Sequence, residues 1–432
     1  MSSLPINVKK YLDKYGTEVR PLTWRSSAII EMIVIVPAIS EYENVKRLLA
    51  SLSAADNKYA DKILVLFVVN NLQSSPKEVK DENQKTLEYL HEKMNDGISG
   101  ESFSLGFIDA ASSGNELDEK NGGVGLARKI GMDAALSLFN YGSVKKKILV
   151  CLDADCTVSQ NYFTEIYEEF NRQKLHAAVT TFRHSLSNEE NREAILCYEI
   201  FLRYYVLSLR FAGSPYAFHT IGSTMICDVE SYIKVEGMNK QKAAEDFYFL
   251  EKLAKNVSIG EIKNAVVYPS SRGSWRVPFG TGQRVNRFIS QTQNEYLLYN
   301  FNSFLVLKKW LQLFLLNDLS AEEFLVEAEK IRSSLAAFLI EQKFEKTWSE
   351  ISRTAKTDEQ LQKQKNIWFD GFKMLKLIHY LRDNGFPPQP MFASLNRLFE
   401  VMEIEFDFRS EDEIPPFEIQ QKYLETLRNL DN

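Results

Sequence analysis

Runs of apolar residues alternate with amphipathic stretches along the N-terminal part of the chain. Four of the runs stop at polar residues and predict strands buried on both faces, at 31–38, 62–69, 103–108 and 147–152. Apolar positions recur at helical spacing over 43–53, 76–94, 123–139 and 160–171. This alternation predicts a doubly wound α/β domain with a mostly parallel sheet, in which ligands bind at the carboxyl ends of the strands.

The pattern changes in the last third of the chain. Strand signals become scarce after about residue 282, and helical patterns cover 294–316 and 320–341. Ser320-Ala-Glu-Glu323 predicts a capping box, whereas Asn384-Gly-Phe-Pro-Pro and Pro415-Pro416 interrupt helices. We therefore expect an N-terminal extension at 1–29, a ligand-binding α/β domain at 30–285 and a mainly helical region at 286–432.

Two apolar stretches approach the length of a membrane span. Glu199, Arg203 and Arg210 interrupt the stretch 194–212, and Lys308 and Lys309 interrupt 301–316. Both are expected to pack inside the protein, the alternative being amphipathic helices that lie along a membrane surface. The N-terminus lacks the apolar segment of a secretory signal, so a cytoplasmic location is expected.

Composition narrows the class of protein. The 432 residues are 44% hydrophobic and 25% charged, as in globular proteins and unlike disordered, collagen-like or coiled-coil chains. With 52 Lys+Arg against 58 Asp+Glu, the net charge of −6 offers no excess of positive charge to a nucleic acid. The four cysteines form no C-x-x-C pair, so we expect reduced thiols rather than a disulfide framework.

An acidic pair, Asp153-Ala-Asp155, directly follows the apolar run 147–152. At the end of a buried strand both carboxylates can reach one small volume. Carboxylate oxygens suit Mg²⁺ or Mn²⁺, which in turn can hold the diphosphate of a nucleotide. The alternative is two acids in a surface turn, where Asp is common.

A second acidic pair, Glu245-Asp246, stands between two alanines and the apolar run 247–250, and is expected to begin a helix. Acids at that position stabilise the positive end of a helix dipole. The functional alternative is a general base, which takes a proton from an attacking hydroxyl group.

The order of these motifs carries a resemblance. The chain resembles the family 2 glycosyltransferases, inverting enzymes of the GT-A fold, over about residues 30–290. The segments that match are, in order, Pro37-Ala-Ile-Ser-Glu41, Asn70-Asn71, Gly123-Val-Gly-Leu-Ala-Arg128-Lys-Ile-Gly131, Asp153-Ala-Asp155, Gly222-Ser223 with Gly237, and Glu245-Asp246.

The resemblance implies transfer of a sugar, such as a hexose, from a nucleotide-sugar donor to a hydroxyl acceptor, with Mn²⁺ or Mg²⁺ as cofactor. Lipid-linked glycans and cell-surface polysaccharide precursors are acceptors of proteins that resemble this one. Peripheral contact with the inner face of a membrane and oligomer formation are left open.

The resemblance also implies roles for individual residues. Asp155 would ligate the metal, together with Asp153, which contacts the ribose and sugar side. Asp246 would be the base, with Glu245 as runner-up. The donor pocket would be lined by Pro37, Glu41, Asn70, Asn71 and Arg128, and the acceptor would meet Gly222 and Ser223. The family more often has an acid where Asn70-Asn71 stands.

An arginine-rich stretch follows at 272–284. Arg272 and Arg276 can clamp a diphosphate by bidentate hydrogen bonds, and Trp275 can face the acceptor. The alternative is a surface loop that tolerates such residues. Related synthases carry Q-x-x-R-W after the base, from which this stretch departs, so we do not infer a processive polymerase.

His219 and the glycines at 122–125 have weaker signals. His219 is a tentative metal ligand or acceptor contact, and the alternative is a histidine hydrogen-bonded within the core. Gly122-Gly-Val-Gly125 has neither the G-x-G-x-x-G spacing of a dinucleotide site nor the G-K-[ST] ending of a P-loop. Use of NAD or ATP is therefore not implied.

Two other classes of protein remain as alternatives. A nucleotidyltransferase also joins a doubly wound sheet to acidic metal sites, but its glycine-rich basic signature is missing after Pro37. A catalytically silent sugar- or partner-binding module would keep the fold without turnover. The presence of both acidic pairs favours an enzyme over that module.

Overall fold

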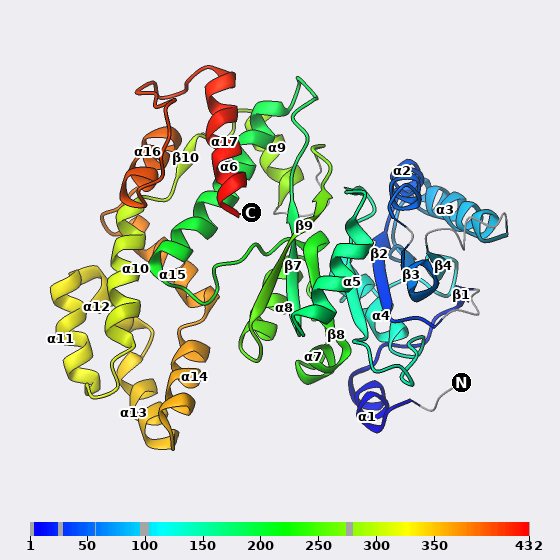
Figure 1. Ribbon diagram of the computed structural model, residues 1–432, viewed down its shortest axis with the longest axis horizontal. Helices are drawn as coiled ribbons and strands as arrows, with labels where there is room; N and C mark the ends of the chain where they lie inside the picture. Colours follow the sequence, from blue (N-terminus) through cyan, green and yellow to red (C-terminus); the bar gives the residue numbers. More distant parts are fainter. Residues whose placement is uncertain (1–3, 25–28, 57, 96–102, 274–279, 432) are drawn as a thin grey trace. The chain divides into compact units, whose positions relative to one another are not determined.

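The computed structural model describes residues 4–24, 29–56, 58–95, 103–273 and 280–431 (Figure 1). The chain divides into two compact units. The α/β unit contains Met1–Asn188 and Thr220–Gln283, and the helical unit contains Glu189–His219 and Arg284–Asn432. The segment 189–219, which the sequence placed inside the α/β domain, groups with the C-terminal helices.

One sheet organises the α/β unit. Its strands in the described residues are Leu22–Trp24 (β1), Met32–Ala38 (β2), Ile63–Asn70 (β3), Ser104–Ala110 (β4), Ile148–Cys151 (β5), Thr157–Val158 (β6), Ala177–Phe182 (β7), Met225–Asp228 (β8) and Ile259–Tyr268 (β9). Their spatial order is β1-β4-β3-β2-β5-β8-β7-β9-β6. Strands β2, β3, β4, β5, β7 and β9 run in one direction, and β1, β8 and β6 run against them. The expected mostly parallel sheet is confirmed, and β2 to β5 are the four strands expected from the apolar runs.

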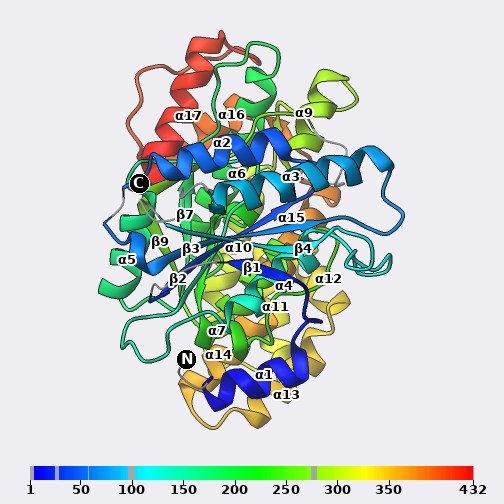
Figure 2. The same ribbon diagram turned by 90° about the vertical axis from the view of Figure 1, so that its right-hand side faces the viewer.

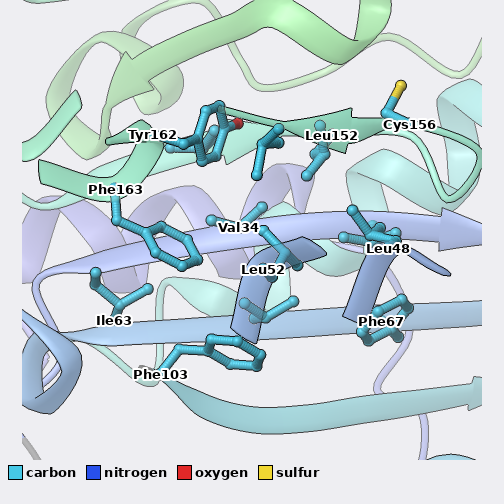
Figure 3. Packing of buried hydrophobic residues seen from close by; sticks show 14 of the residues in the cluster. Val34, Leu48, Leu52, Ile63, Phe67, Phe103, Leu152, Cys156, Tyr162 and Phe163 are labelled. Atoms are coloured by element: carbon cyan, nitrogen blue, oxygen red, sulfur yellow. The ribbon is translucent and has the colours of Figure 1, made fainter. Parts of the chain in front are cut away.

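Helices cover both faces of this sheet, as Figure 2 shows for α2 and α3 on one side and α4 on the other. The bounds are Ile6–Tyr15 (α1), Tyr42–Ser53 (α2), Lys77–Asn95 (α3), Val124–Ala135 (α4), Tyr162–Arg172 (α5), Val229–Lys234 (α7) and Glu245–Ala254 (α8), with short 3₁₀ turns at Ala60–Lys62 (η1) and Gly222–Thr224 (η2). Helices α2, α3 and α5 bury apolar side chains in one cluster against the strands. Figure 3 shows Leu48 and Leu52 of α2 and Phe163 of α5 packed with Val34 and Phe67 of the sheet.

The opposite face receives α4, which lies very close to the strands. A Cβ atom at Gly131 would stand 2.5 Å from Ile35 Cγ2 and 2.9 Å from Val68 Cγ2. The absence of a side chain at this position therefore lets the helix backbone approach β2 and β3. This close approach places Arg128, one turn earlier on α4, next to the carboxyl ends of the strands.

The helical unit consists of α6 and the helices after residue 280. The bounds are Arg192–Ala212 (α6), Thr281–Ile289 (α9), Phe301–Phe314 (α10), Ala321–Ile331 (α11), Ser333–Glu341 (α12), Phe344–Thr354 (α13), Asp358–Trp368 (α14), Gly371–Asp383 (α15), Met391–Val401 (α16) and Phe417–Asp431 (α17), with a short ladder of Leu297–Leu298 (β10) and Gln389–Pro390 (β11). The boundary between the two units falls within α9. Among the described helices, none is both long and apolar enough to cross a membrane.

The expected capping box at Ser320 is present, but the helix it begins ends earlier than expected. Arg332 takes an extended backbone conformation and separates α11 from α12. Its guanidinium lies 3.9 Å from the centre of the Phe386 ring, and its Nε donates to Ser334 Oγ at 3.1 Å. The helical pattern that continues through 320–341 in the sequence is therefore interrupted at Arg332 in the structure.

A buried polar cluster attaches α1 to the α/β unit. Tyr11 Oη donates to Asp133 Oδ1 at 2.8 Å, and Lys129 Nζ donates to Tyr11 Oη at 2.8 Å. Gly237 lies against this cluster with a φ of +74°, and a Cβ atom there would stand 2.0 Å from Tyr11 Oη. Gly237 is thus required twice, for its backbone conformation and for the space that Tyr11 occupies.

We expect Gly237→Ala to lower the free energy of unfolding by roughly 2–4 kcal/mol. The alanine would be strained in the left-handed conformation, and its Cβ atom would also displace the buried, hydrogen-bonded phenol of Tyr11. Gly114→Ala is the matched control, since its φ is +90° but nothing lies within 4 Å of the added Cβ. That variant should lose only about 1 kcal/mol. Urea unfolding of the two variants measures the difference, and equal losses would contradict the role of the Tyr11 contact.

Candidate active site at the carboxyl edge of the sheet

The carboxyl ends of β2, β3 and β5 lie at one edge of the sheet, and the expected site residues follow them. Glu41 comes after β2, Asn70 ends β3, and Asp153 and Asp155 follow β5. Because β8 runs antiparallel to β5, its beginning lies at the same edge and brings Gly222 there. The structure therefore collects residues from four separate segments at the place where parallel sheets bind ligands.

Arg128 of α4 bridges two of the acids. Its Nη1 donates to the Glu245 carboxylate and its Nη2 donates to Asp153 Oδ1 at 2.5 Å. Arg128 is only 2% exposed and Glu245 only 4%. A buried guanidinium of this kind is stable only when carboxylates neutralise it, so the three side chains form one electrostatic unit.

Two glycines make room for that unit. A Cβ atom at Gly222 would stand 2.3 Å from Arg128 Nη2, and one at Gly125 would stand 2.4 Å from the carbonyl oxygen of Gln241. The first glycine admits the guanidinium, and the second admits the loop that leads into Glu245. Both glycines thus allow Arg128 to approach its partners. Gly125 belongs to the same sequence motif as Arg128.

Arg272 forms a second bridge. It follows β9, and its Nη2 donates to the Glu41 carboxylate and, at 3.3 Å, to Asp155 Oδ2. Glu41 also accepts a hydrogen bond from Asn44 Nδ2. The arginine of this bridge is more open to solvent than Arg128, since its side chain is 38% exposed, while Glu41 is buried.

Asp246 follows Glu245 in the first turn of α8, and its pKa is raised. Burial, reinforced by the negative charge of Glu245, raises the pKa of Asp246 to about 7. Its Oδ1 accepts the backbone N–H of Phe247 at 2.7 Å. A carboxyl group that titrates near neutrality can both take and return a proton.

Two residues with left-handed backbone conformations immediately precede site acids. Ser40 has a φ of +50° before Glu41, and Ala244 has a φ of +58° before Glu245. Such conformations cost a non-glycine residue of order 1 kcal/mol, and they persist only when surrounding contacts impose them. Both bends set the direction in which the following carboxylate leaves the backbone.

The asparagines expected to contact a nucleotide make hydrogen bonds within the protein. Asn70 Nδ2 donates to the carbonyl oxygens of Ala38 and Val68, both at 3.1 Å. Asn71 Nδ2 donates to two other backbone carbonyl oxygens, at 3.1 and 3.3 Å. Their amide groups therefore join the strand ends to one another. Contact of these side chains with a donor stays a prediction.

His219 lies in the helical unit, and its Nε2 is 3.0 Å from Asp431 Oδ2. Asp431 also accepts hydrogen bonds from Arg203 and Arg210. This arrangement is that of a buried, hydrogen-bonded histidine, so we leave His219 out of the proposed metal site. Trp275 and Arg276 lie outside the described residues.

Within the described ranges, one group of three metal-ligating side chains comes together, and it lies elsewhere. His176, Asp228 and Glu230 meet at the amino end of β7, opposite the candidate site. The Lys146 ammonium already stands 2.6 Å from Asp228 Oδ2. The charge of the buried carboxylate is thereby balanced by a lysine.

Two residues of α3 were missed by sequence reasoning, which predicted a helix over 76–94 and singled out no residue in it. Asn83 is buried and bonds to the ends of β2 and β3, and Glu82 bonds to the loop between β2 and α2. A signal was present, because Asn83 shares a helix face with Leu87, Leu90 and Met94. A polar residue on an apolar face indicates a buried hydrogen-bonding role.

Comparison with solved structures gives distant matches to glycosyltransferases, the class that the sequence resembles. S. aureus TarS 1-349 in complex with UDP-GlcNAc is 13% identical, with a TM-score of 0.40, over 78% of this chain and 90% of that chain. The mannosyltransferase PcManGT from Pyrobaculum calidifontis, in complex with GDP-Man and Mn²⁺, is 13% identical, with a TM-score of 0.37, over 98% of this chain and 92% of that one.

Glucosyl-3-phosphoglycerate synthase from Mycobacterium tuberculosis, in complex with Mn²⁺, UDP and glucosyl-3-phosphoglycerate, is 11% identical, with a TM-score of 0.33, over 55% of this chain and 71% of that chain. No protein-family model and no curated protein matches the chain.

We expect Arg128→Met to lower the free energy of unfolding by about 3–5 kcal/mol, because it leaves Glu245 buried without its cation. Adding Glu245→Gln removes that uncompensated charge and should restore at least about 1 kcal/mol of the loss. Urea unfolding of wild type, both single variants and the double variant measures this coupling. Losses that simply add would show that the two side chains are not one electrostatic unit.

Proposed function

We propose that the protein is a metal-dependent, inverting glycosyltransferase that moves a sugar from a nucleotide-sugar donor to a hydroxyl acceptor. The observation that carries the proposal is the division of labour among the acids at one sheet edge. Asp153 and Asp155 each accept a hydrogen bond from an arginine, whereas desolvation and the charge of Glu245 raise the pKa of the half-buried Asp246 to about 7. Arg128 connects the two acidic pairs by bridging Asp153 and Glu245.

The reaction requires a base on one side of the anomeric carbon and a stabilised leaving group on the other. The acceptor oxygen forms a bond to the anomeric carbon as its proton passes to the Asp246 carboxylate. The bond from that carbon to the diphosphate oxygen breaks, and its electron pair leaves with the nucleoside diphosphate. Attack opposite the leaving group inverts the anomeric configuration.

The residues present fit a divalent cation. Five carboxylates (Glu41, Asp153, Asp155, Glu245 and Asp246) share the edge with Arg128 and Arg272, which leaves an excess of negative charge. Asp155, together with Asp153, would hold Mn²⁺ or Mg²⁺ through the hard oxygen ligands that these ions prefer. When bound, the ion would offset the negative charge that develops on the departing diphosphate.

The remaining contacts are assigned by the same proposal. Pro37, Glu41 and Arg272 would face the nucleotide and its diphosphate, and Gly222 and Ser223 would face the acceptor. The acceptor class is a lipid-linked glycan or a cell-surface polysaccharide precursor, as the resemblance of the sequence implies. By the same resemblance, we place the protein in the cytoplasm, at the inner face of a membrane.

Asp246→Asn should abolish sugar transfer, because an amide cannot accept the proton of the acceptor hydroxyl. In wild type the rate of transfer should rise with pH through an apparent pKa of about 7, because the base must be unprotonated. The rise should be seen in kcat/KM for the acceptor, measured between pH 5 and 9. A rate that is flat across this range, or an active Asp246→Asn variant, contradicts the assignment.

The free energy of unfolding, measured as a function of pH, shows whether Asp246→Asn is folded. The pKa of Asp246 is raised in the folded state, so its contribution to stability is present at low pH and is lost as pH rises toward 7. Asn cannot ionise and escapes this loss. Asp246→Asn should therefore be more stable than wild type at pH 8, with the difference vanishing toward pH 4.

Nucleotide binding tests the metal site separately from catalysis. A thermal-shift screen of UDP, GDP and CDP, each with and without Mn²⁺, should give a metal-dependent rise in Tm with one nucleotide, because a ligand of the native state stabilises it. The rise should disappear in Asp155→Asn and persist in Asp246→Asn. Absence of any rise at millimolar nucleotide would overturn the proposal and favour a silent binding module.

A further inference from the structure

Asn83 of α3 joins two strand ends through one buried side chain. Its Oδ1 accepts the backbone N–H of Ser40 at 2.8 Å, and its Nδ2 donates at 2.9 Å both to the carbonyl oxygen of Asn70 and to Asn71 Oδ1. The residue is 1% exposed. Both its acceptor and its donor group are thus committed to the loop after β2 and to the end of β3.

Glu82, the preceding residue of α3, holds the same loop from the other side. Its Oε1 accepts the backbone N–H of Tyr42 at 3.1 Å, and its Oε2 accepts the hydroxyl of Ser40. Tyr42 begins α2, where the N-cap residue is Glu41 and caps nothing with its own side chain. A carboxylate from another helix therefore satisfies the first of the backbone N–H groups at the start of α2, which have no partner within the helix.

The consequence falls on Glu41. Glu41 stands between Ser40 and Tyr42, the two residues that Glu82 holds. Its carboxylate accepts a hydrogen bond from Arg272, which also reaches Asp155. Ser40, held at a φ of +50° by hydrogen bonds to its N–H and its hydroxyl, sets the bend from which Glu41 departs. Such a conformation is strained for a serine, and these two hydrogen bonds stabilise it.

We propose that Glu82 and Asn83 are positioning residues of the donor pocket, which hold Ser40 in its left-handed conformation and thereby aim Glu41 at Arg272. This inference rests on the proposed function, because the pocket it concerns is that of the nucleotide-sugar. Neither residue touches the reacting atoms. They act through the loop 39–41, so their loss weakens donor binding and leaves proton transfer to Asp246 unchanged.

The test uses two matched pairs of variants. Asn83→Leu removes the hydrogen bonds, and Leu90→Ala is its control, since Leu90 lies on the same face of α3, is fully buried and makes no contact with the loop through hydrogen bonds. Glu82→Ala removes the hydrogen bonds to Ser40 and Tyr42. Glu82→Gln should restore them, because its amide oxygen still accepts from the Tyr42 N–H and its amide N–H₂ can donate to the Ser40 hydroxyl.

The readouts are the Kd of the nucleoside diphosphate that binds wild type with Mn²⁺, measured by calorimetry, and kcat and KM for the donor. We expect Asn83→Leu and Glu82→Ala to raise Kd and KM by about tenfold or more, with kcat changed less than about threefold. Leu90→Ala and Glu82→Gln should keep Kd within about threefold of wild type. Melting temperatures show whether each pair is matched in stability.

Two outcomes separate the failures. If wild type binds a nucleoside diphosphate and Asn83→Leu binds it equally well, or if Leu90→Ala weakens binding as much, the positioning role is overturned and the proposed function stands. If wild type binds no nucleoside diphosphate, the proposed function is overturned and this inference with it.

Discussion

The buried guanidinium of Arg128 is the constraint on which the candidate site depends. A cation that is 2% exposed requires carboxylate partners, and it takes one from the end of β5 and one from the start of α8. Those two segments are therefore fixed relative to each other. Asp246 inherits its position from Glu245, and the negative charge of Glu245 adds to the burial that makes Asp246 hard to ionise. The ion-pair unit thus fixes the position of the proposed base, while desolvation is the main cause of its raised pKa, which Glu245 raises further and Arg128 lowers.

The second arginine bridge, from Arg272 to Glu41 and Asp155, is more exposed than the first. The pair of Arg272 and Asp155 is partly exposed, so solvent weakens their attraction and the pair can separate when a ligand enters. Arg128, by contrast, is enclosed and has little room to move. Backbone strain lies beside both bridges, at Ser40 and Ala244, where neighbouring side chains and packing impose it. The site is therefore expected to be rigid around Arg128 and the proposed base Asp246, and more adaptable around Arg272, where the diphosphate is expected.

Sequence reasoning succeeded where the signal is local. Strands β2 to β5 and helices α2 to α5 follow from apolar periodicity, and both acidic pairs were found because they sit at the ends of such elements. It failed where a distant residue decides. Nothing near Arg332 in the sequence predicts the break between α11 and α12. A histidine hydrogen-bonded within the core was the alternative for His219, but the sequence could not name its partner, Asp431. Arg128 and Asn83 both act through partners that are distant in the sequence. Arg128 was found because it lies in a motif of the resemblance, whereas Asn83 lies in no motif and was overlooked.

The antiparallel strand β8 has a consequence for how the chain reaches its native state. It lies between β5 and β7, yet it begins more than seventy residues after β5 ends, with α6 made in the interval. At about 5–20 residues per second of synthesis, one side of β5 stays unpaired for roughly 4–15 s. An apolar strand exposed for that time is a template for wrong pairing with another chain. Expression at high concentration should therefore be limited by aggregation of a nascent intermediate that lacks residues 225–228, and slower initiation or chaperone capture of that intermediate is the natural remedy.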